Sequence, residues 1–342
     1  MLTYYPKVSF IMPTLNAAKF MEAALESIIA QDYPKDKMEL IVADAGSTDA
    51  TLVIAERYNV KIIQNPFITS EGGKMAGLKA ATGDYIALID SDNILTDKHW
   101  LEEMIEPLEV NASAVCSEPI SYTWRQEDGF ISRYCALIGM NDPFVMFLGK
   151  YDRMNMLSGK WTEVAHKEED LGKYLLIDLD KNGLPTIGAN GAVFRRKFLQ
   201  KFSEGNYLFD VDILAAAIEE LGSVQVIKTK NGIVHTYCES SIGKFSKKQA
   251  RRVRDFVYNK SMNRRKYAWF AKNNRQGYIK FILYCVLVLP LVIQAIQGYK
   301  KKRDTAWFFH PLACELTLFQ YGLGTIVSFV KKAELDRQGW SQ

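Results

Sequence analysis

The sequence lacks paired cysteines. It has 342 residues and five cysteines, an odd number, and no two of them form a CxxC pair. A disulfide framework and a structural zinc site both require cysteines at closer or paired spacings, so this pattern argues against both. We therefore expect the folded part of the chain to lie in a reducing cytosol.

The beginning of the chain also lacks the pattern of a secretory leader. No basic region precedes an apolar stretch, and Pro13 soon interrupts the apolar run that begins at Val8. We therefore expect no signal peptide. Two common phosphate-binding patterns are absent as well. Glu71-Gly72-Gly73-Lys74 lacks the full GxxxxGK[ST] pattern and no GxGxxG follows a predicted strand, so we reject a P-loop and a dinucleotide fingerprint.

What the first 90 residues do contain is an alternation of strand and helix patterns. Short β-branched or apolar runs predict parallel strands buried on both faces. These runs are Val8–Met12, Leu40–Ala43, Val60–Ile63 and Tyr85–Ile89. Between the first two, Met21, Leu25, Ile28 and Ile29 form one helix stripe with Asn16 as the expected N-cap. The pattern predicts a doubly wound α/β fold with a mostly parallel sheet, whose ligands bind beyond the carboxyl ends of the strands.

The strongest chemical signal follows the last of these strands, which ends abruptly in Asp90-Ser91-Asp92. Two like charges ~4 Å apart repel by about 4 kcal/mol at an effective dielectric of 20, so such a pair favours a bound cation. Mg²⁺ or Mn²⁺ suits oxygen ligands and keeps positions open for substrate phosphates. In isolation, a role in capping or turn formation is the alternative.

The C-terminal part is basic and then apolar. Residues 244–275 carry twelve Lys and Arg against the single acid Asp255, although the net charge of the whole chain is only +4. Beside an apolar stretch, such a run predicts a membrane-surface element attracted to anionic headgroups. A nucleic acid is an alternative partner for this basic run. A solvent-exposed helix without any partner is the other alternative. The apolar neighbour favours the membrane, and we expect no nucleic acid.

The apolar run from Phe281 to Ile293 is shorter than the ~20 residues of a spanning helix, and Pro290 interrupts it. A full crossing would put Lys300 to Arg303 on the far side, against the positive-inside tendency. We therefore expect a monotopic hairpin or interfacial helices on the cytosolic leaflet. A kinked span and a buried helix pair that covers the rest of the protein are the alternatives.

Three short motifs together carry a family resemblance. They are Pro13-Thr14-Leu15-Asn16 after the first strand, Ala43-Asp44-Ala45-Gly46-Ser47-Thr48-Asp49 after the second, and Ala81-Thr82-Gly83-Asp84-Tyr85 leading into Asp90-Ser91-Asp92. In this order and spacing they resemble the nucleotide-binding half of the inverting family 2 glycosyltransferases, which have the GT-A fold. The resemblance covers Val8 to Asn93 well and Ile187 to Leu221 in part.

The resemblance implies a role for each matching residue. Pro13, Thr14 and Asn16 would shape the nucleotide pocket, and Asp44 would accept a hydrogen bond from uracil or guanine. Asp90 would lie near the ribose and the metal, and Asp92 would bind the metal directly. The family often has two adjacent acids where this chain has Asp44-Ala45. Asx-turn formation is the alternative role of Asp44, and we expect Asp49 to cap a helix.

Four further residues complete the expected site. Lys74 would reach the diphosphate, with a solvent-facing lysine as the alternative. Asp210 aligns with the family's catalytic base and Asp212 follows it, while Phe209 replaces the usual preceding acid, so the choice of base stays open. Stabilisation of a helix N-terminus is the alternative role of both acids. His235 would be a further metal ligand, or a histidine satisfied by ordinary hydrogen bonds.

Together these observations predict residues 1–243 as a GT-A catalytic domain and 244–342 as a basic and apolar, membrane-associated helical segment. The expected enzyme is a metal-dependent hexosyltransferase of glycan biosynthesis, with a cytoplasmic catalytic domain. It would transfer a sugar from a UDP- or GDP-linked donor to the hydroxyl of a lipid or lipid-linked acceptor at the cytosolic membrane face. The alternatives are a polyprenyl-phosphate glycosyltransferase and an inactive nucleotide-binding scaffold protein.

Overall fold

The computed structural model of the protein describes residues 2, 4–188, 190–267 and 275–330. These residues form two compact units. The first combines the described residues up to Ile120 with Ala165–His235, and the second combines Ser121–Val164 with the described residues from Thr236 on. The predicted division after residue 243 therefore differs from this grouping, because residues 121–164 belong to the same compact unit as the C-terminal helices. That 1–243 alone is catalytic stays a prediction.

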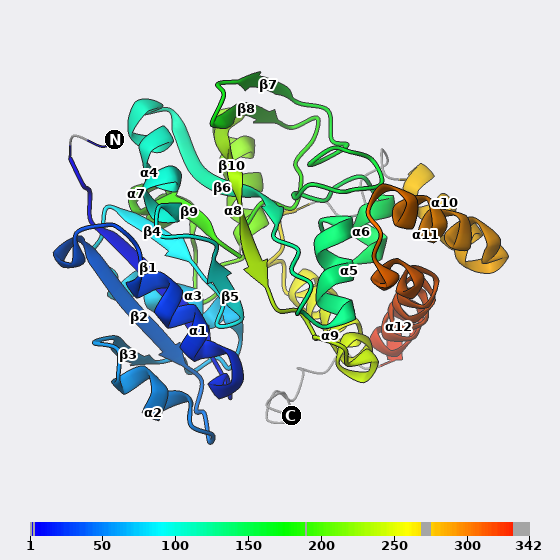
Figure 1. The fold of residues 1–342 in the computed structure, drawn as a ribbon, viewed down its shortest axis with the longest axis horizontal. Coiled ribbons are helices and arrows are strands. Elements are labelled where there is room, and N and C mark those ends of the chain that lie inside the picture. Colours follow the sequence, from blue (N-terminus) through cyan, green and yellow to red (C-terminus); the bar gives the residue numbers. More distant parts are fainter. Residues whose placement is uncertain (1, 3, 189, 268–274, 331–342) are drawn as a thin grey trace. The chain divides into compact units, whose positions relative to one another are not determined.

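A single mixed sheet forms the framework of the first unit (Figure 1). Its strand order is β3-β2-β1-β4-β9-β6-β10-β8-β7, and β5 pairs with β10. The strands are β1 (Val8–Thr14), β2 (Met38–Asp44), β3 (Lys61–Gln64), β4 (Tyr85–Leu88), β5 (Asn93–Leu95), β6 (Ala114–Tyr122), β7 (Lys167–Asp170), β8 (Tyr174–Asp180), β9 (Ala192–Arg195) and β10 (Ser223–His235).

The four predicted strands are confirmed as β1 to β4, and they pair in parallel. All residues of β1 and β4 are buried, as expected of strands covered on both faces. The prediction of a mostly parallel sheet is wrong for the rest of it. Strands β9, β8, β7 and β5 form antiparallel pairs, so the sheet is mixed. In β8 the side chains alternate between buried and exposed toward its end, the pattern of a strand with one solvent-facing side.

Helices flank this sheet. They are α1 (Ala18–Ile29), α2 (Thr51–Glu56), α3 (Ser70–Ala80), α4 (Trp100–Val110), α7 (Arg196–Phe202) and α8 (Asp210–Leu221), with a short 3-10 turn η1 (Lys35–Lys37). In α1 the predicted stripe is buried except for Ile29, which is 39% exposed because it lies at the end of the helix. The glycines of α3 permit close packing on the sheet, since a Cβ on Gly73 would lie 2.7 Å from Pro13 Cβ. Gly72-Gly73 is thus a packing feature.

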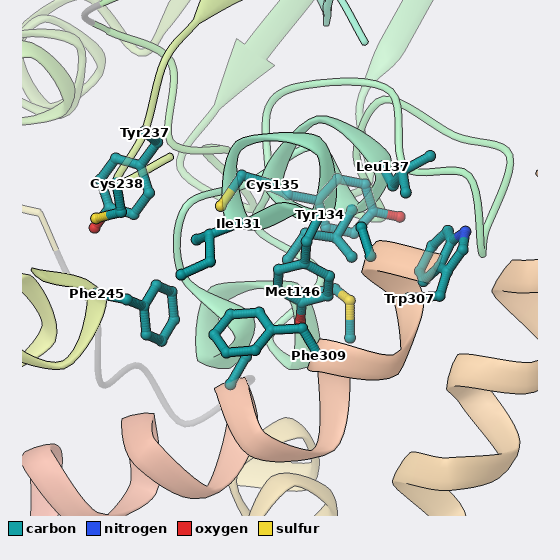
Figure 2. Packing of buried hydrophobic residues seen from close by; sticks show 14 residues of the cluster. Ile131, Tyr134, Cys135, Leu137, Met146, Tyr237, Cys238, Phe245, Trp307 and Phe309 are labelled. Atoms are coloured by element: carbon teal, nitrogen blue, oxygen red, sulfur yellow. The ribbon is translucent and has the colours of Figure 1, made fainter. Parts of the chain in front are cut away.

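The second unit is helical. Its helices are α5 (Phe130–Ile138), α6 (Pro143–Phe147), α9 (Ile242–Ser261), α10 (Arg275–Leu287), α11 (Leu289–Lys301) and α12 (His310–Val330), with a 3-10 turn η3 (Thr305–Phe309). Figure 2 shows its core, where Tyr134 of α5 lies beside Met146 and Phe309. Tyr134 and Phe309 meet edge to face, with ring centroids 5.4 Å apart, an arrangement that adds to the gain from apolar burial.

Within the described ranges, no single helix has the length and apolar composition needed to cross a membrane. The pair α10 and α11 meets that criterion only when the two are taken together, and it is bent by 98°.

Candidate active site

The end of β2 and the loop after it border a cavity of about 370 Å³, which is also lined by Leu52 of α2, by residues 62–64 of β3 and by Asn65, Pro66 and Ile68 beyond β3. The Asp44 carboxylate is buried and already accepts several hydrogen bonds. Thr14 Oγ1 donates to Oδ1, and the backbone N–H groups of Gly46 and Ser47 donate to Oδ2 at 2.8 and 2.9 Å. The Ser47 hydroxyl adds a further donor. Asp44 therefore forms the Asx turn given as its alternative role, and contact with a nucleotide base stays a prediction.

Asn16 joins the same two loops rather than capping a helix. Its backbone is in the left-handed region at φ 49°, and its Oδ1 accepts from the Thr48 N–H at 2.8 Å. The residue in the cap position of α1 is Ala17, so the predicted N-cap at Asn16 is wrong. Asp49 supplies the missing acceptor, because its carboxylate accepts from the first amides of both α1 and α2. The loops after β1 and β2 are thereby fixed to each other.

Asp90 and Asp92, the two acids after β4, contact different residues. Asp90 Oδ1 accepts a hydrogen bond from the Ser70 hydroxyl at 3.4 Å, and the Asp90 N–H donates to Asn93 Oδ1. Asp92 lies instead beside His235, with 3.5 Å between Asp92 Oδ1 and His235 Nε2. The pairing of β5 with β10 sets His235 opposite Asn93, so strand register brings these residues together.

The Asp92 and His235 pair fits a divalent cation in part. A carboxylate oxygen suits both Mg²⁺ and Mn²⁺, while an imidazole nitrogen suits transition ions better. Over the part of the chain that the structure describes, no group of three or more His, Cys, Asp or Glu side chains is arranged to hold a metal. Two protein ligands leave the other positions for phosphate oxygens and water, as is usual where a cation binds together with phosphates. Asp90 stays a predicted ligand.

Lys74 and Asp210 form a buried ion pair, with Lys74 Nζ 2.9 Å from Asp210 Oδ2. The alternative of a solvent-facing Lys74 is wrong, because only 3% of this residue is exposed. Burial alone would lower the pKa of Lys74, but the carboxylates of Asp210, Asp90 and Glu71 raise it above its usual value. Burial raises the pKa of the Asp210 carboxyl, although Lys74 opposes this shift.

The loop before β9 packs directly against the Asp210 side chain. A Cβ on Gly188 would lie 2.3 Å from Asp210 Cβ, so only glycine lets the loop before β9 pass here. Asp210 Oδ1 is buried and accepts no hydrogen bond from any described residue. Asp212, two residues further along α8, is also buried, and its N–H donates to the Phe209 carbonyl. Both acids lie in the first turn of α8, consistent with stabilisation of its N-terminus.

Sequence reasoning missed the partner of this loop. The Gly188 N–H donates to Glu118 Oε1 at 3.0 Å, and Glu118 Oε2 accepts from Lys228 in a fully buried ion pair. The signal was a charge among apolar residues in each of two strands: Glu118 is the only charged residue of β6, and Lys228 directly follows Val226 and Ile227 in β10. Such charges stay buried only when they are paired. Asn93 was also missed, and it links Asp90 to Asn190 of the glycine loop.

The structure thus groups the predicted residues into three sets. Thr14, Asn16 and Asp44 join the loops after β1 and β2, and Pro13 packs against α3. Lys74 pairs with Asp210, and Asp92 pairs with His235. The first set lies at the carboxyl ends of β1 and β2, and Asp92 follows β4, at the edge where ligands of open α/β sheets bind, while Lys74 and Asp210 come from α3 and α8.

Comparison with known proteins gives a family for this arrangement. The sequence profile of glycosyl transferase family 2 matches residues 9–202. A poly(ribitol-phosphate) beta-N-acetylglucosaminyltransferase, TarS of Staphylococcus aureus, is 38% identical over 97 residues, which are 26% of this chain and 17% of that protein. Glycosyltransferase AglE of Haloferax volcanii is 25% identical over 146 residues, 41% of this chain and 48% of that protein. The matched regions therefore span less than half of these relatives.

Among solved structures, a mannosyltransferase from Pyrobaculum calidifontis in complex with GDP-Man and Mn²⁺ has a similar fold. The TM-score is 0.54 at 16% identity, with 97% of this chain and 89% of that chain covered. At this identity the likeness shows the fold alone.

Proposed function

This chain belongs to glycosyltransferase family 2, and from that premise we propose that it moves a hexose from a nucleotide-diphosphate sugar to an acceptor hydroxyl. The proposal includes inversion at the anomeric carbon and dependence on a divalent cation. It also includes a lipid or lipid-linked acceptor at the cytosolic face of a membrane. The donor would occupy the region at the carboxyl ends of β1, β2 and β4.

The observation that carries the proposal is the environment of Asp210. A general base must be ionised, yet basic enough to take a proton. Lys74 favours the ionised carboxylate, while burial makes that carboxylate more basic than an ordinary aspartate. Asp210 Oδ1 has no hydrogen-bond donor among the described residues, and the Gly188 backbone packs against the Asp210 side chain and fixes its position. These features support Asp210 rather than Asp212 as the base.

In the proposed step, the acceptor oxygen forms a bond to the anomeric carbon as the bond from that carbon to the diphosphate oxygen breaks. The hydroxyl proton moves to Asp210 Oδ1, and the nucleoside diphosphate leaves with the bonding electron pair. Lys74 keeps its proton throughout, because the surrounding carboxylates raise its pKa. Glu118 holds the Gly188 backbone, which packs against the Asp210 side chain.

Asp92 and His235 are the residues that would hold the divalent cation, and the bound cation would neutralise charge that develops on the departing diphosphate. The GDP-Man and Mn²⁺ in the Pyrobaculum mannosyltransferase support a nucleotide sugar and a metal of this kind. Either UDP or GDP is compatible with the proposal.

For the acceptor, the TarS relative supports a hydroxyl, since its name describes transfer to a poly(ribitol phosphate) with a beta linkage. A polyprenyl phosphate is already ionised at neutral pH and needs no base, so the buried Asp210 favours the hydroxyl. A lipid-linked acceptor is supported by the apolar and basic composition of residues 244–330.

The test of the proposal measures donor binding and turnover by the full chain. A ligand that binds the folded state raises its melting temperature by mass action, so we expect UDP or GDP to raise it more with Mn²⁺ than without. Release of the nucleoside diphosphate from one of the common sugar donors should then depend on the metal. A chain that binds the nucleotide but never releases product would instead be the scaffold protein.

A further inference from the structure

Helices α10 and α11 carry apolar side chains on their outer faces as well as on their inner ones. The inner faces pack in a small core with Phe281, Cys285 and Leu291. The exposed side chains of α10 lie at i, i+3, i+4, i+7 and i+8, which is one helix face. They are Ile279, Ile282, Leu283, Val286 and Leu287, and those of α11 are Leu289, Val292, Ile293 and Ile296.

A water-facing helix would place charged or polar residues at these positions. Here no charged residue occurs between Lys280 and Lys300. The exposed patch is therefore continuous in sequence over two helices, whereas soluble proteins usually expose large apolar residues singly. Among the described residues, no element covers these two outer faces.

The junction of the two helices makes this apolar surface prominent. Val288 has φ 57°, a left-handed conformation that is costly for a β-branched residue. The backbone bends there by 98° and forms a corner. The residues around the corner are among the most exposed apolar side chains of the chain, at 71% for Val286, 62% for Leu287 and 64% for Leu289.

Basic side chains border the apolar surface. Lys280 lies near the start of α10, and Lys300 and Arg303 lie at and beyond the end of α11, all of them exposed. In the same compact unit, α9 exposes Lys244, Lys247 and Arg254. Spacings of three and ten residues put these three side chains on one side of the helix.

An apolar surface bordered by basic side chains is complementary to an anionic bilayer, in which apolar acyl chains lie beneath negatively charged headgroups. Lysine and arginine can lay their methylene stems along an apolar layer and keep the charge among headgroups. A second protein is the less suitable occupant. Protein interfaces are enriched in aromatic residues, Met and Arg at their centre, and the centre of this surface is entirely aliphatic.

We propose that α10 and α11 form an interfacial elbow, which inserts its aliphatic outer faces among the acyl chains of an anionic membrane while the bordering basic side chains contact headgroup phosphates. This rests on the proposed function and deepens it, because it names the surface by which the enzyme reaches a lipid-linked acceptor.

The experiment measures vesicle flotation of the full chain. Vesicles of phosphatidylcholine alone are compared with vesicles containing 30% phosphatidylglycerol. We expect binding to the anionic vesicles, and at least a tenfold loss of partitioning for the double variant Leu287→Gln, Leu289→Gln. The matched control, Val53→Gln with Val110→Gln, changes two equally exposed residues of the first unit and should bind like the native chain. Melting temperatures confirm that both variants fold.

A second variant tests the charge. Lys300→Gln with Arg303→Gln should weaken binding to the anionic vesicles and leave binding to neutral vesicles unchanged. Equal binding of the elbow variant and the native chain would overturn the proposal. So would a native dimer that the elbow variant converts to a monomer, because a second copy of the chain would then cover this surface.

Nucleoside diphosphate release without vesicles separates this inference from the proposed function. The elbow variant should release product at the native rate in solution. If no protein releases product while vesicle binding still depends on the elbow, the proposed function fails and the membrane surface stands. If the native chain releases product normally but does not bind vesicles, the proposed membrane surface fails and the proposed sugar transfer stands.

Discussion

Lys74 Nζ lies 2.9 Å from Asp210 Oδ2, and this buried pair joins the start of α3 to the start of α8. The two residues are 136 positions apart in the chain. Because one partner is a proposed base and the other a permanent cation, the pair links folding of the first unit to catalysis. Removing either partner leaves a buried charge without compensation, which costs about 3–5 kcal/mol in other proteins.

The first prediction concerns Asp210. Asp210→Asn keeps the shape of the side chain but removes the proton acceptor, so kcat should fall by about 10²–10³. The shift of melting temperature caused by a nucleoside diphosphate should persist. Asp212→Asn is the matched control, with a buried acid from the same helix turn, and should retain most activity. Near-native turnover of Asp210→Asn would favour a polyprenyl-phosphate acceptor.

The second prediction concerns pH. The base works only when ionised, so activity should fall as pH drops through the pKa of Asp210, which burial holds above the usual value of a carboxyl. Lys74→Met removes the cation that opposes this shift. The acid limb of the kcat profile should therefore move to higher pH. An acid limb at the same pH in both proteins would show that Lys74 does not control the base.

The third prediction concerns Asp92 and His235. Asp92→Ala removes the expected oxygen ligand and should abolish metal-dependent transfer, whereas His235→Ala should weaken the apparent affinity for Mn²⁺ more than for Mg²⁺, which prefers oxygen ligands. Titration of product release with each metal measures both effects. The control is His99→Ala, an exposed histidine of the same unit. Undiminished activity of Asp92→Ala would contradict the mechanism.

The parallel half of the sheet was predictable from sequence because its strands are covered on both faces. Continuous runs such as Val8–Met12 and Tyr85–Ile89 follow directly from that burial. The antiparallel half was not predicted. β7 is exposed along its whole length and so carries no apolar signal. β10 finds its partners β5 and β8 far away in sequence, and such pairings have no local pattern.

The candidate site, like the sheet, was only partly predictable from the sequence. Residues at or soon after strand ends, such as Asp44 and Asp92, could be identified because topology puts the ends of parallel strands at one edge. Their partners could not. His235 meets Asp92 through strand register, and Glu118 meets Lys228 across 110 positions, so neither contact follows from the sequence around one residue.

The fourth prediction concerns Glu118 and Lys228, which are both fully buried. Glu118→Leu leaves the Lys228 ammonium and the Gly188 N–H without their acceptor, so it should lower the free energy of unfolding by about 3–5 kcal/mol. The double variant Glu118→Leu, Lys228→Met removes both charges and should recover much of that loss. Its kcat should stay reduced while KM for the donor changes little, because the Gly188 backbone that packs against Asp210 has lost its anchor. Full recovery of kcat would mean that Glu118 has no positioning role.

The fifth prediction concerns His310 in the second unit. Its Nδ1 lies 2.7 Å from the Tyr134 hydroxyl and its Nε2 lies 3.1 Å from Gln294 Oε1, and burial lowers its pKa to about 4. In the unfolded chain the pKa is about 6.5. Between these two values the unfolded chain binds the proton more readily than the folded one. The stability that neutral His310 contributes is therefore present above pH 6.5 and is lost as pH falls toward 4.

The size of this effect follows from the pKa difference, at about 1.4 kcal/mol per unit, so up to about 3 kcal/mol should be lost across that range. Denaturant unfolding followed by near-UV circular dichroism between pH 7.5 and 4.5 measures it, since Tyr134 lies in the core of the second unit. His310→Gln cannot titrate, so its stability should fall less steeply with acid even though it starts lower. His99→Gln, at an exposed position, should keep the native slope. Parallel slopes for His310→Gln and the native chain would show that another group controls acid stability.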